Sequence, residues 1–278
     1  MAFKTILTVT GLDQGARDLK LASGLCEQVD AHLAVLVLAL AVPPPAGVYA
    51  AMVSDPWLQE RQHDLQQLKA RAAEVSGLLS GSALSADVSG EYPEIAWADE
   101  TVGRRARYAD LTVVGPSLLA AETLRDKVIE GALFYSGKPL LLVPEGSQPT
   151  LKPKRVLLAW DSRVEATRAA RESLEILKTA ESVRLALVDP IQGDDDQGAE
   201  PGADAAAYLA RHGVKVTVDR LPSQGHSVAS VLRQHAVDTS SELLVMGGYG
   251  HSHLRERIFG GVTKSMLEDP RLPVLMAR

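Results

Sequence analysis

The chain has little cysteine, few aromatic residues and no excess of basic residues. Cys26 is the one cysteine among 278 residues, so no internal disulfide can form, which fits a reducing compartment. The formal net charge of -6 argues against a protein that binds nucleic acid through a broad basic surface. With 4% aromatic and 46% hydrophobic residues, the cores should consist of Leu, Val, Ala and Ile.

Long hydrophobic runs are also lacking. No apolar run approaches the ~18 residues that a membrane-spanning helix needs. The apolar stretch 31–45 is divided by prolines, and Met1 leads directly into a strand pattern without the features of a signal peptide. We therefore expect a cytoplasmic protein whose partners include neither a membrane nor a nucleic acid.

Strand patterns alternate with helical patterns along the whole chain. In the first half, strands are expected at 4–10, 34–41, 84–88, 111–114 and 140–143, and helices at 12–29, 57–79, 93–108 and 118–135. In the second half, strands are expected at 154–160, 183–188, 214–219, 243–246 and 273–277, and helices at 166–178, 203–212, 228–235 and 262–267. This alternation predicts βαβ units and parallel sheets.

The second half repeats the order and spacing of the first, which indicates an internal duplication. A turn-rich segment, 144–153, separates the two copies. The predicted domains are residues 1–146 and residues 154–278.

A glycine-rich segment follows the apolar strand 243–246. The strand ends at Gly247, Gly248 and Gly250, and Gly260-Gly261 then opens a predicted helix. Glycines let a ligand approach the backbone, and a helix N-terminus presents free N–H groups and a partial positive charge. The segment therefore predicts a phosphate or nucleotide site, although the same glycines could serve only to turn the chain.

The spacing Gly247-x-x-Gly250, nine residues, Gly260 resembles the nucleotide loop of the universal stress protein family, whose pattern is G-x-x-G, nine residues, G-[S/T]. It matches neither the P-loop nor the Rossmann fingerprint. Gly261 stands where the family's nucleotide binders carry Ser or Thr, and one lost hydrogen bond costs on the order of 1 kcal/mol. The resemblance covers nearly the whole chain, as a tandem two-domain member.

The resemblance implies an adenine nucleotide alpha hydrolase-like α/β fold with two doubly wound, parallel, five-stranded sheets. It also implies pairing of the two domains through their last strands, with a homodimer as a further option. The expected ligand is ATP, ADP or AMP, with or without Mg²⁺, in the C-terminal domain. The implied site residues are Asp161, Val188, Met246, Gly247, Gly250, Arg257, Gly260, Gly261, Val262 and Thr263.

Asp161 and Val188 would frame the adenosine, and the glycine backbone would hold the phosphates. Asp161 could instead cap the helix that follows it. Arg257 lies in the polar segment between the glycines and is a candidate for a phosphate contact.

The first half departs from the pattern. Gly11 takes the position of Asp161, and Pro116 interrupts the glycine turn after the fourth strand. Glu130-Gly131 replaces Gly260-Gly261, which would place a carboxylate where a phosphate would bind. This half is expected to hold no nucleotide and to have a structural role.

The sequence demands no catalytic chemistry. His251 and His253 lack an adjacent third ligand for a metal site, and no nucleophile elbow is present. We expect a regulatory or binding module of the stress response rather than an enzyme, with weak nucleotide hydrolysis at most. A stress-response scaffold that binds protein partners and no nucleotide stays open as the alternative.

Overall fold

Two α/β units make up the part of the chain that the computed structural model describes, which is residues 3–43, 55–191, 193, 200–249 and 261–278. We call Phe3–Ser136 the N-terminal unit and Gly137–Arg278 the C-terminal unit. Both consist of strands that alternate with helices, so the α/β class predicted from the sequence is confirmed.

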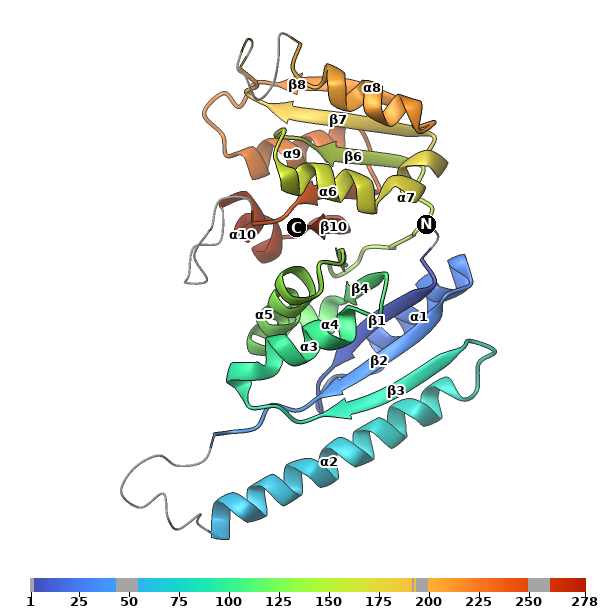
Figure 1. Cartoon of the computed structure of the whole chain (residues 1–278), viewed down its shortest axis with the longest axis vertical. Helices are drawn as coiled ribbons and strands as arrows, with labels where there is room; N and C mark the ends of the chain where they lie inside the picture. Colours follow the sequence, from blue (N-terminus) through green and yellow to red (C-terminus); the bar gives the residue numbers. More distant parts are fainter. Residues whose placement is uncertain (1–2, 44–54, 192, 194–199, 250–260) are drawn as a thin grey trace. The chain divides into compact units, whose positions relative to one another are not determined.

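The N-terminal unit contains a parallel sheet with the strand order β3-β2-β1-β4, and α2 runs alongside β3 (Figure 1). Its elements are β1 (Thr5–Thr10), α1 (Arg17–Val29), β2 (His32–Leu38), α2 (Asp55–Leu79), β3 (Ala86–Glu91), the 3₁₀ turn η1 (Ile95–Trp97), α3 (Ala98–Ala106), β4 (Leu111–Val114), α4 (Pro116–Ala120), α5 (Glu122–Glu130) and the π-helix η2 (Gly131–Ser136).

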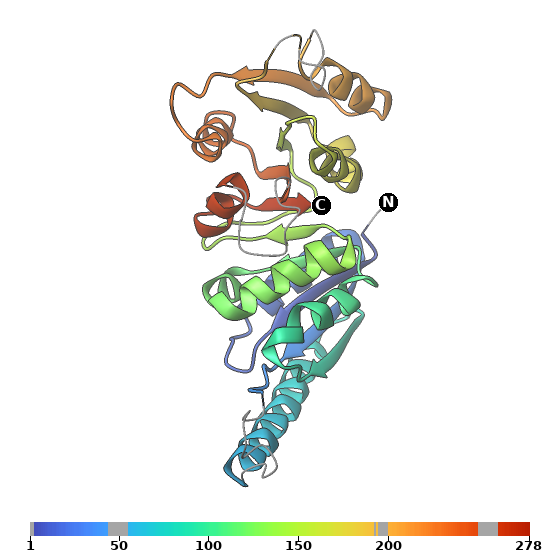
Figure 2. The same cartoon turned by 60° about the vertical axis from the view of Figure 1, so that its left-hand side comes forward.

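The C-terminal unit has the strand order β5-β10-β9-β6-β7-β8, in which only β5 runs antiparallel to its neighbour β10. Its elements are β5 (Leu140–Leu142), β6 (Arg155–Ala159), α6 (Val164–Glu172), α7 (Leu174–Thr179), β7 (Ser182–Val188), α8 (Ala203–Arg211), β8 (Val216–Leu221), α9 (Val228–Asp238), β9 (Leu243–Gly247), α10 (Gly261–Glu268) and β10 (Val274–Ala277). Helices α6, α7 and α8 lie on one side of the strands, and α9 and α10 lie on the other (Figure 2).

Equivalent contacts in the two units show the internal repeat. Ile6 of β1 pairs with Leu111 of β4, as Val156 of β6 pairs with Leu243 of β9. The residue before β4, Asp110, accepts hydrogen bonds from the N–H groups of Lys4 and Thr5, and the residue before β9, Glu242, accepts one from Lys154. In each copy, therefore, an acidic residue directly before the fourth strand connects that strand to the start of the first.

The structure differs from the expected element boundaries at several places. The predicted helix 118–135, for example, is divided into α4, α5 and η2. Two further differences concern the first helix and the division into units. The first helix begins at Arg17 rather than at residue 12, because the Gln14 side chain accepts a hydrogen bond from the Gly11 N–H at 2.9 Å and holds a loop. The two units divide between Ser136 and Gly137, earlier than the expected end of the first domain at residue 146. In this division β5, which pairs with β10, lies in the C-terminal unit.

The cores consist mainly of Leu, Val, Ala and Ile, as the composition indicated. Among the described residues, Phe3 and Tyr249 are the only buried aromatic side chains. Cys26 is fully buried in α1, and burial raises the pKa of its thiol to about 12, so it acts as a small apolar core residue. No helix within the described ranges is both long and apolar enough to cross a membrane.

Helices α3 and η2 approach each other unusually closely at two glycines. A Cβ atom on Gly103 would lie 2.2 Å from Tyr135 Cβ, and one on Gly131 would lie 2.5 Å from the Asp99 carbonyl oxygen. Gly131 begins η2 but follows α5 directly with helical dihedral angles, so the chain stays helical through this position. Glu130, which the alignment of the two repeats puts where a phosphate would bind, is the last residue of α5.

Glu130 gives the N-terminal unit a pH-dependent stability. Burial raises the pKa of Glu130, and Lys127, at 3.7 Å, partly opposes this. A folded-state pKa above the unfolded one means that the stabilising contribution is present below the unfolded pKa and is lost as the pH rises through the folded pKa.

We therefore expect the Glu130→Gln variant to be more stable than the parent near pH 7, with the difference shrinking toward about pH 4. Urea unfolding of both proteins across this pH range measures the difference. A variant that is less stable near pH 7 would show that the ion pair with Lys127 outweighs the desolvation.

Candidate functional site

A pocket of about 530 Å³ lies at the carboxyl ends of β6, β7 and β9 in the C-terminal unit. Its volume falls within the range of small-molecule sites, and its position is the usual one for ligands of open parallel sheets. The lining residues come from these strand ends and from the N-terminal parts of α6, α9 and α10. They are Ala159, Trp160, Asp161, Arg163, Ala166, Ala186, Val188, Ser227, Val228, Ala229, Leu232, Met246, Gly247, Gly261, Val262, Thr263 and Ser265.

The pocket brings together most of the site residues predicted from the sequence. Those that line it are Asp161, Val188, Met246, Gly247, Gly261, Val262 and Thr263. Gly250, Arg257 and Gly260 lie outside the described residues, as do His251 and His253. Residues from four separate strand ends and helix starts thus meet at one cavity.

Two helices begin at the wall of this pocket. Ser227 caps α9 by accepting a hydrogen bond from the Ser230 N–H at 3.2 Å, and Gly261 is the first residue of α10. Each helix N-terminus carries a partial positive charge of about half a unit and N–H groups without helical partners. This side of the pocket therefore favours an anionic group.

Thr263 adds a hydroxyl group to the anion-favouring side. Its Oγ1 accepts a hydrogen bond from the Tyr249 N–H at 3.2 Å, and Thr263 is buried. A hydroxyl can accept one bond while donating another, so Thr263 retains a donor for a ligand. The same bond fixes Tyr249, whose φ of 63° is unusual for a residue with a side chain.

The two glycines of the pocket differ in why they lack a side chain. A Cβ on Gly247 would lie 2.6 Å from the Ala166 backbone nitrogen, so the close packing of α6 against β9 requires glycine there. A Cβ on Gly261 would meet no heavy atom of the described residues within 4 Å. Among the described residues, therefore, none requires glycine at position 261 for packing.

Asp161 both shapes the turn before α6 and lines the pocket. Its Oδ1 accepts a hydrogen bond from the Arg163 N–H at 3.1 Å, and its Oδ2 lies 3.9 Å from Arg163 Nε. The intervening Ser162 has a φ of 63°, which this short turn requires. The Asp161 side chain is 60% exposed, so its carboxylate can still accept hydrogen bonds from a ligand.

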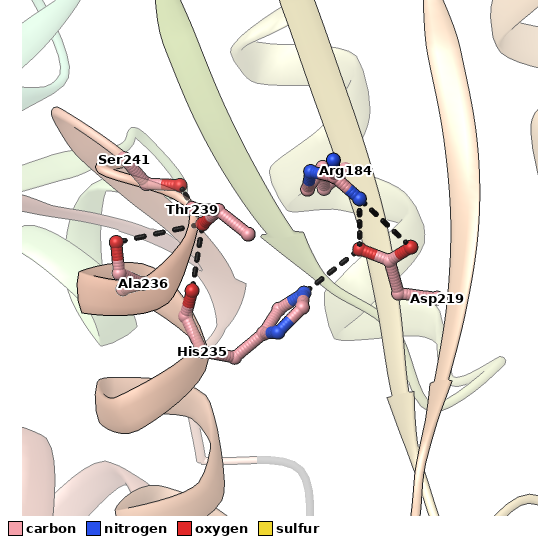
Figure 3. Close-up of polar contacts among 6 residues, drawn as sticks. All are labelled: Arg184, Asp219, His235, Ala236, Thr239 and Ser241. Carbon is pink, nitrogen blue, oxygen red and sulfur yellow. Dashed lines mark hydrogen bonds and ion pairs between the residues drawn. The ribbon is translucent and has the colours of Figure 1, made fainter.

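A polar cluster ties α9 to the outer strands of the sheet (Figure 3). Asp219 of β8 accepts two hydrogen bonds from Arg184 Nη1, at 3.1 and 3.0 Å, and its Oδ2 lies 2.8 Å from His235 Nε2. Asp219 and His235 are largely buried. Leu232, one turn before His235, faces the pocket, so this cluster holds the α9 wall in place.

Sequence reasoning did not identify several pocket residues, including Trp160, Arg163, Ser227, Leu232 and Ser265. Trp160 and Arg163 flank Asp161 at the end of the first strand of the second repeat, so their sequence position was the available signal. Ser227 stands directly before a helical pattern, which is typical of an N-cap. Ser265 is one turn into α10 and gave no such signal.

The equivalent end of the N-terminal unit is filled by its own side chains. The buried Asp18 carboxylate of α1 accepts hydrogen bonds from the N–H groups of Ser117, at 3.1 Å, and Leu118, at 2.9 Å. The Gln14 amide bonds both Gly11 and Ser117. An internal carboxylate therefore already satisfies the N–H groups at the start of α4, where an external anion would otherwise bind.

We expect Asp18→Ala to lower the free energy of unfolding by about 2 kcal/mol, because two buried N–H groups lose their acceptor. Chemical denaturation followed by circular dichroism measures this loss. Asp13→Ala is the matched control, since Asp13 is an exposed residue of the preceding loop and should change stability little. Equal effects of the two substitutions would contradict the capping role of Asp18.

Part of the chain is similar in sequence to known proteins. Residues 152–278, which contain the pocket, match the sequence model of the Universal stress protein family. Residues 152–278 therefore form a universal stress protein domain. The universal stress protein Slr1230 of Synechocystis sp. is 28% identical over 142 residues, which are 51% of this chain and 47% of that protein. The match thus spans about half the length of this relative.

Solved structures extend the likeness in fold to the whole chain. A universal stress protein from Archaeoglobus fulgidus has a TM-score of 0.68 at 15% identity, with 100% of this chain and 97% of that chain covered. A candidate universal stress protein from Pseudomonas aeruginosa has a TM-score of 0.58 at 16% identity, with 99% and 93% covered. The universal stress protein fold therefore includes the N-terminal unit, which the family's sequence model does not match.

Proposed function

We propose that the universal stress protein domain of this chain binds an adenine nucleotide, ATP, ADP or AMP, in the pocket of the C-terminal unit. The observation that supports this is the meeting of apolar strand ends with the N-termini of α9 and α10 in one cavity of about 530 Å³. An apolar wall beside an anion-favouring wall suits a ligand with a planar base and a phosphate chain.

In this proposal Asp161 and Val188 frame the adenosine. The Asp161 carboxylate can accept a hydrogen bond from a ribose hydroxyl or from the exocyclic amine of adenine. The phosphates lie at the start of α10, near Gly261, Val262 and Thr263. Within the described ranges, no group of three or more metal-ligating side chains occurs, so a Mg²⁺ ion would be held mainly by the phosphates.

One nucleotide per chain is expected. In the N-terminal unit, Asp18 already occupies the N–H groups of Ser117 and Leu118, and a phosphate there would meet a buried carboxylate. That unit then has a structural role in the proposal.

The simplest test examines the protein as purified, without added nucleotide. After denaturation and removal of the chain, an adenine absorbance spectrum in the supernatant supports the proposal, and its nucleotide can be identified by chromatography. A supernatant without a chromophore, combined with no heat on titration with ATP or AMP, would contradict it.

Gly261→Ser should raise the affinity for ATP by roughly five- to tenfold, since a hydroxyl at the start of α10 adds one hydrogen bond of about 1 kcal/mol. No heavy atom of the described residues lies within 4 Å of the position that a Cβ on residue 261 would take. Gly261→Ala is the matched control, because it adds the Cβ atom without the hydroxyl. If Ser and Ala variants bind ATP equally, the phosphates do not reach this position.

The absence of that hydroxyl in the present chain favours a second candidate function. Without a strong phosphate site, the universal stress protein fold could act as a scaffold for protein partners and bind no nucleotide. The chromophore test separates the two, and phosphate release with and without Mg²⁺ detects weak hydrolysis.

A further inference from the structure

Trp160 stands at the apolar side of the pocket. It directly follows β6, and its backbone N–H donates to the Ala186 carbonyl oxygen at 2.9 Å, so the β6–β7 ladder fixes its position. Its side chain is neither fully buried nor fully exposed. The other two tryptophans, Trp57 and Trp97, belong to the N-terminal unit.

Several alanines line the same pocket as Trp160. Ala159 precedes it, Ala186 lies on the neighbouring strand, and Ala166 lies on α6. These small side chains add little bulk to a cavity of about 530 Å³, which is large enough to hold a flat ring. A half-buried tryptophan at a cavity wall contributes less to a core than to a surface on which a ligand can lie.

We propose that Trp160 stacks on the base of the bound nucleotide and makes this pocket prefer purines to pyrimidines. This inference rests on the proposed function, and it assigns a specificity-determining role to a residue outside the predicted set. Stacking depends on the overlapping aromatic area, so a two-ring base gains more from the indole than a one-ring base. The helix N-termini bind the phosphates and do not distinguish bases.

The test is isothermal titration of the full chain with ATP, UTP and inorganic tripolyphosphate, which has no base. Trp160→Leu should weaken ATP binding by roughly tenfold, reduce the preference for ATP over UTP, and leave tripolyphosphate binding unchanged. Trp160→Phe should retain most of the ATP affinity. Trp97→Leu is the matched control, because Trp97 is 61% exposed in the N-terminal unit and should leave all three affinities unchanged.

Fluorescence provides a second measurement. In a chain with Trp57→Phe and Trp97→Phe, Trp160 is the only tryptophan, and ATP should quench its emission more than tripolyphosphate does. Equal loss of ATP and tripolyphosphate binding in Trp160→Leu would show a structural role and overturn the inference. An unchanged ATP affinity in that variant would also overturn it while the proposed function stands. A parent protein that binds no nucleotide would refute both.

Discussion

Gly261→Glu is expected to weaken ATP binding by roughly a hundredfold or more while the fold stays intact. Gly261 is the first residue of α10 and lines the pocket, so the new carboxylate would lie among the phosphates. Two like charges about 5 Å apart repel by roughly 3 kcal/mol at the effective dielectric of a partly buried site. Titration calorimetry with ATP measures the loss.

A loss of ATP binding in Gly261→Glu could come from unfolding or from charge repulsion, and two measurements distinguish these causes. An acidic side chain at a helix N-terminus is favourable by several tenths of a kcal/mol, so Gly261→Glu should unfold no earlier than the parent. Gly261→Gln has the same size without the charge and should bind ATP much more tightly than the Glu variant. If both variants lose ATP binding equally, the effect is steric and the anion-favouring character of this wall is disproved.

Gly103→Ala is expected to destabilise the N-terminal unit by about 3 kcal/mol or more. The added Cβ would lie 2.2 Å from Tyr135 Cβ and 3.0 Å from the Gly131 carbonyl oxygen. Neither atom is the end of a flexible side chain, so α3 and η2 must move apart and lose contact along their length. Overpacking of this kind usually costs about 1–3 kcal/mol, and a clash with backbone lies at the upper end.

The matched control is Gly24→Ala in the middle of α1. A Cβ there would meet no heavy atom of the described residues within 4 Å, and alanine favours a helix over glycine by about 0.5–1 kcal/mol. Urea unfolding should therefore show Gly24→Ala stabilised and Gly103→Ala destabilised. A Gly103→Ala variant as stable as the parent would show that α3 and η2 do not pack as closely as described.

The elements that the sequence predicts well are those whose signal is local. Leu111–Val114 and Leu243–Gly247 are buried along nearly all of their length, so each gives a continuous apolar run that needs no knowledge of its neighbours. The family resemblance indicated pocket residues 161 and 188, and the glycine spacing indicated 261–263. Each stands at the end of a strand or the start of a helix, and these ends meet at one edge of a parallel sheet.

The features that the sequence does not predict depend on distant partners. Asp18 has the pattern of an ordinary acidic residue in a first helical turn, and only the fold brings the N–H groups of Ser117 and Leu118 to it. Gly103 has the pattern of a weak helix former until Tyr135 is placed beside it. The antiparallel pairing of β5 with β10 also joins segments far apart in sequence, and only the family resemblance, which implies pairing through the last strand of each repeat, indicated it.

The stoichiometry of nucleotide binding tests the central claim most directly, namely that one repeat keeps an open anion-binding pocket and the other fills its own. Titration of the full chain with ATP, and separately with AMP, should give one site per chain, and Gly261→Glu should remove it. Two sites per chain, or a single site that survives Gly261→Glu and disappears in Asp18→Ala, would contradict the account.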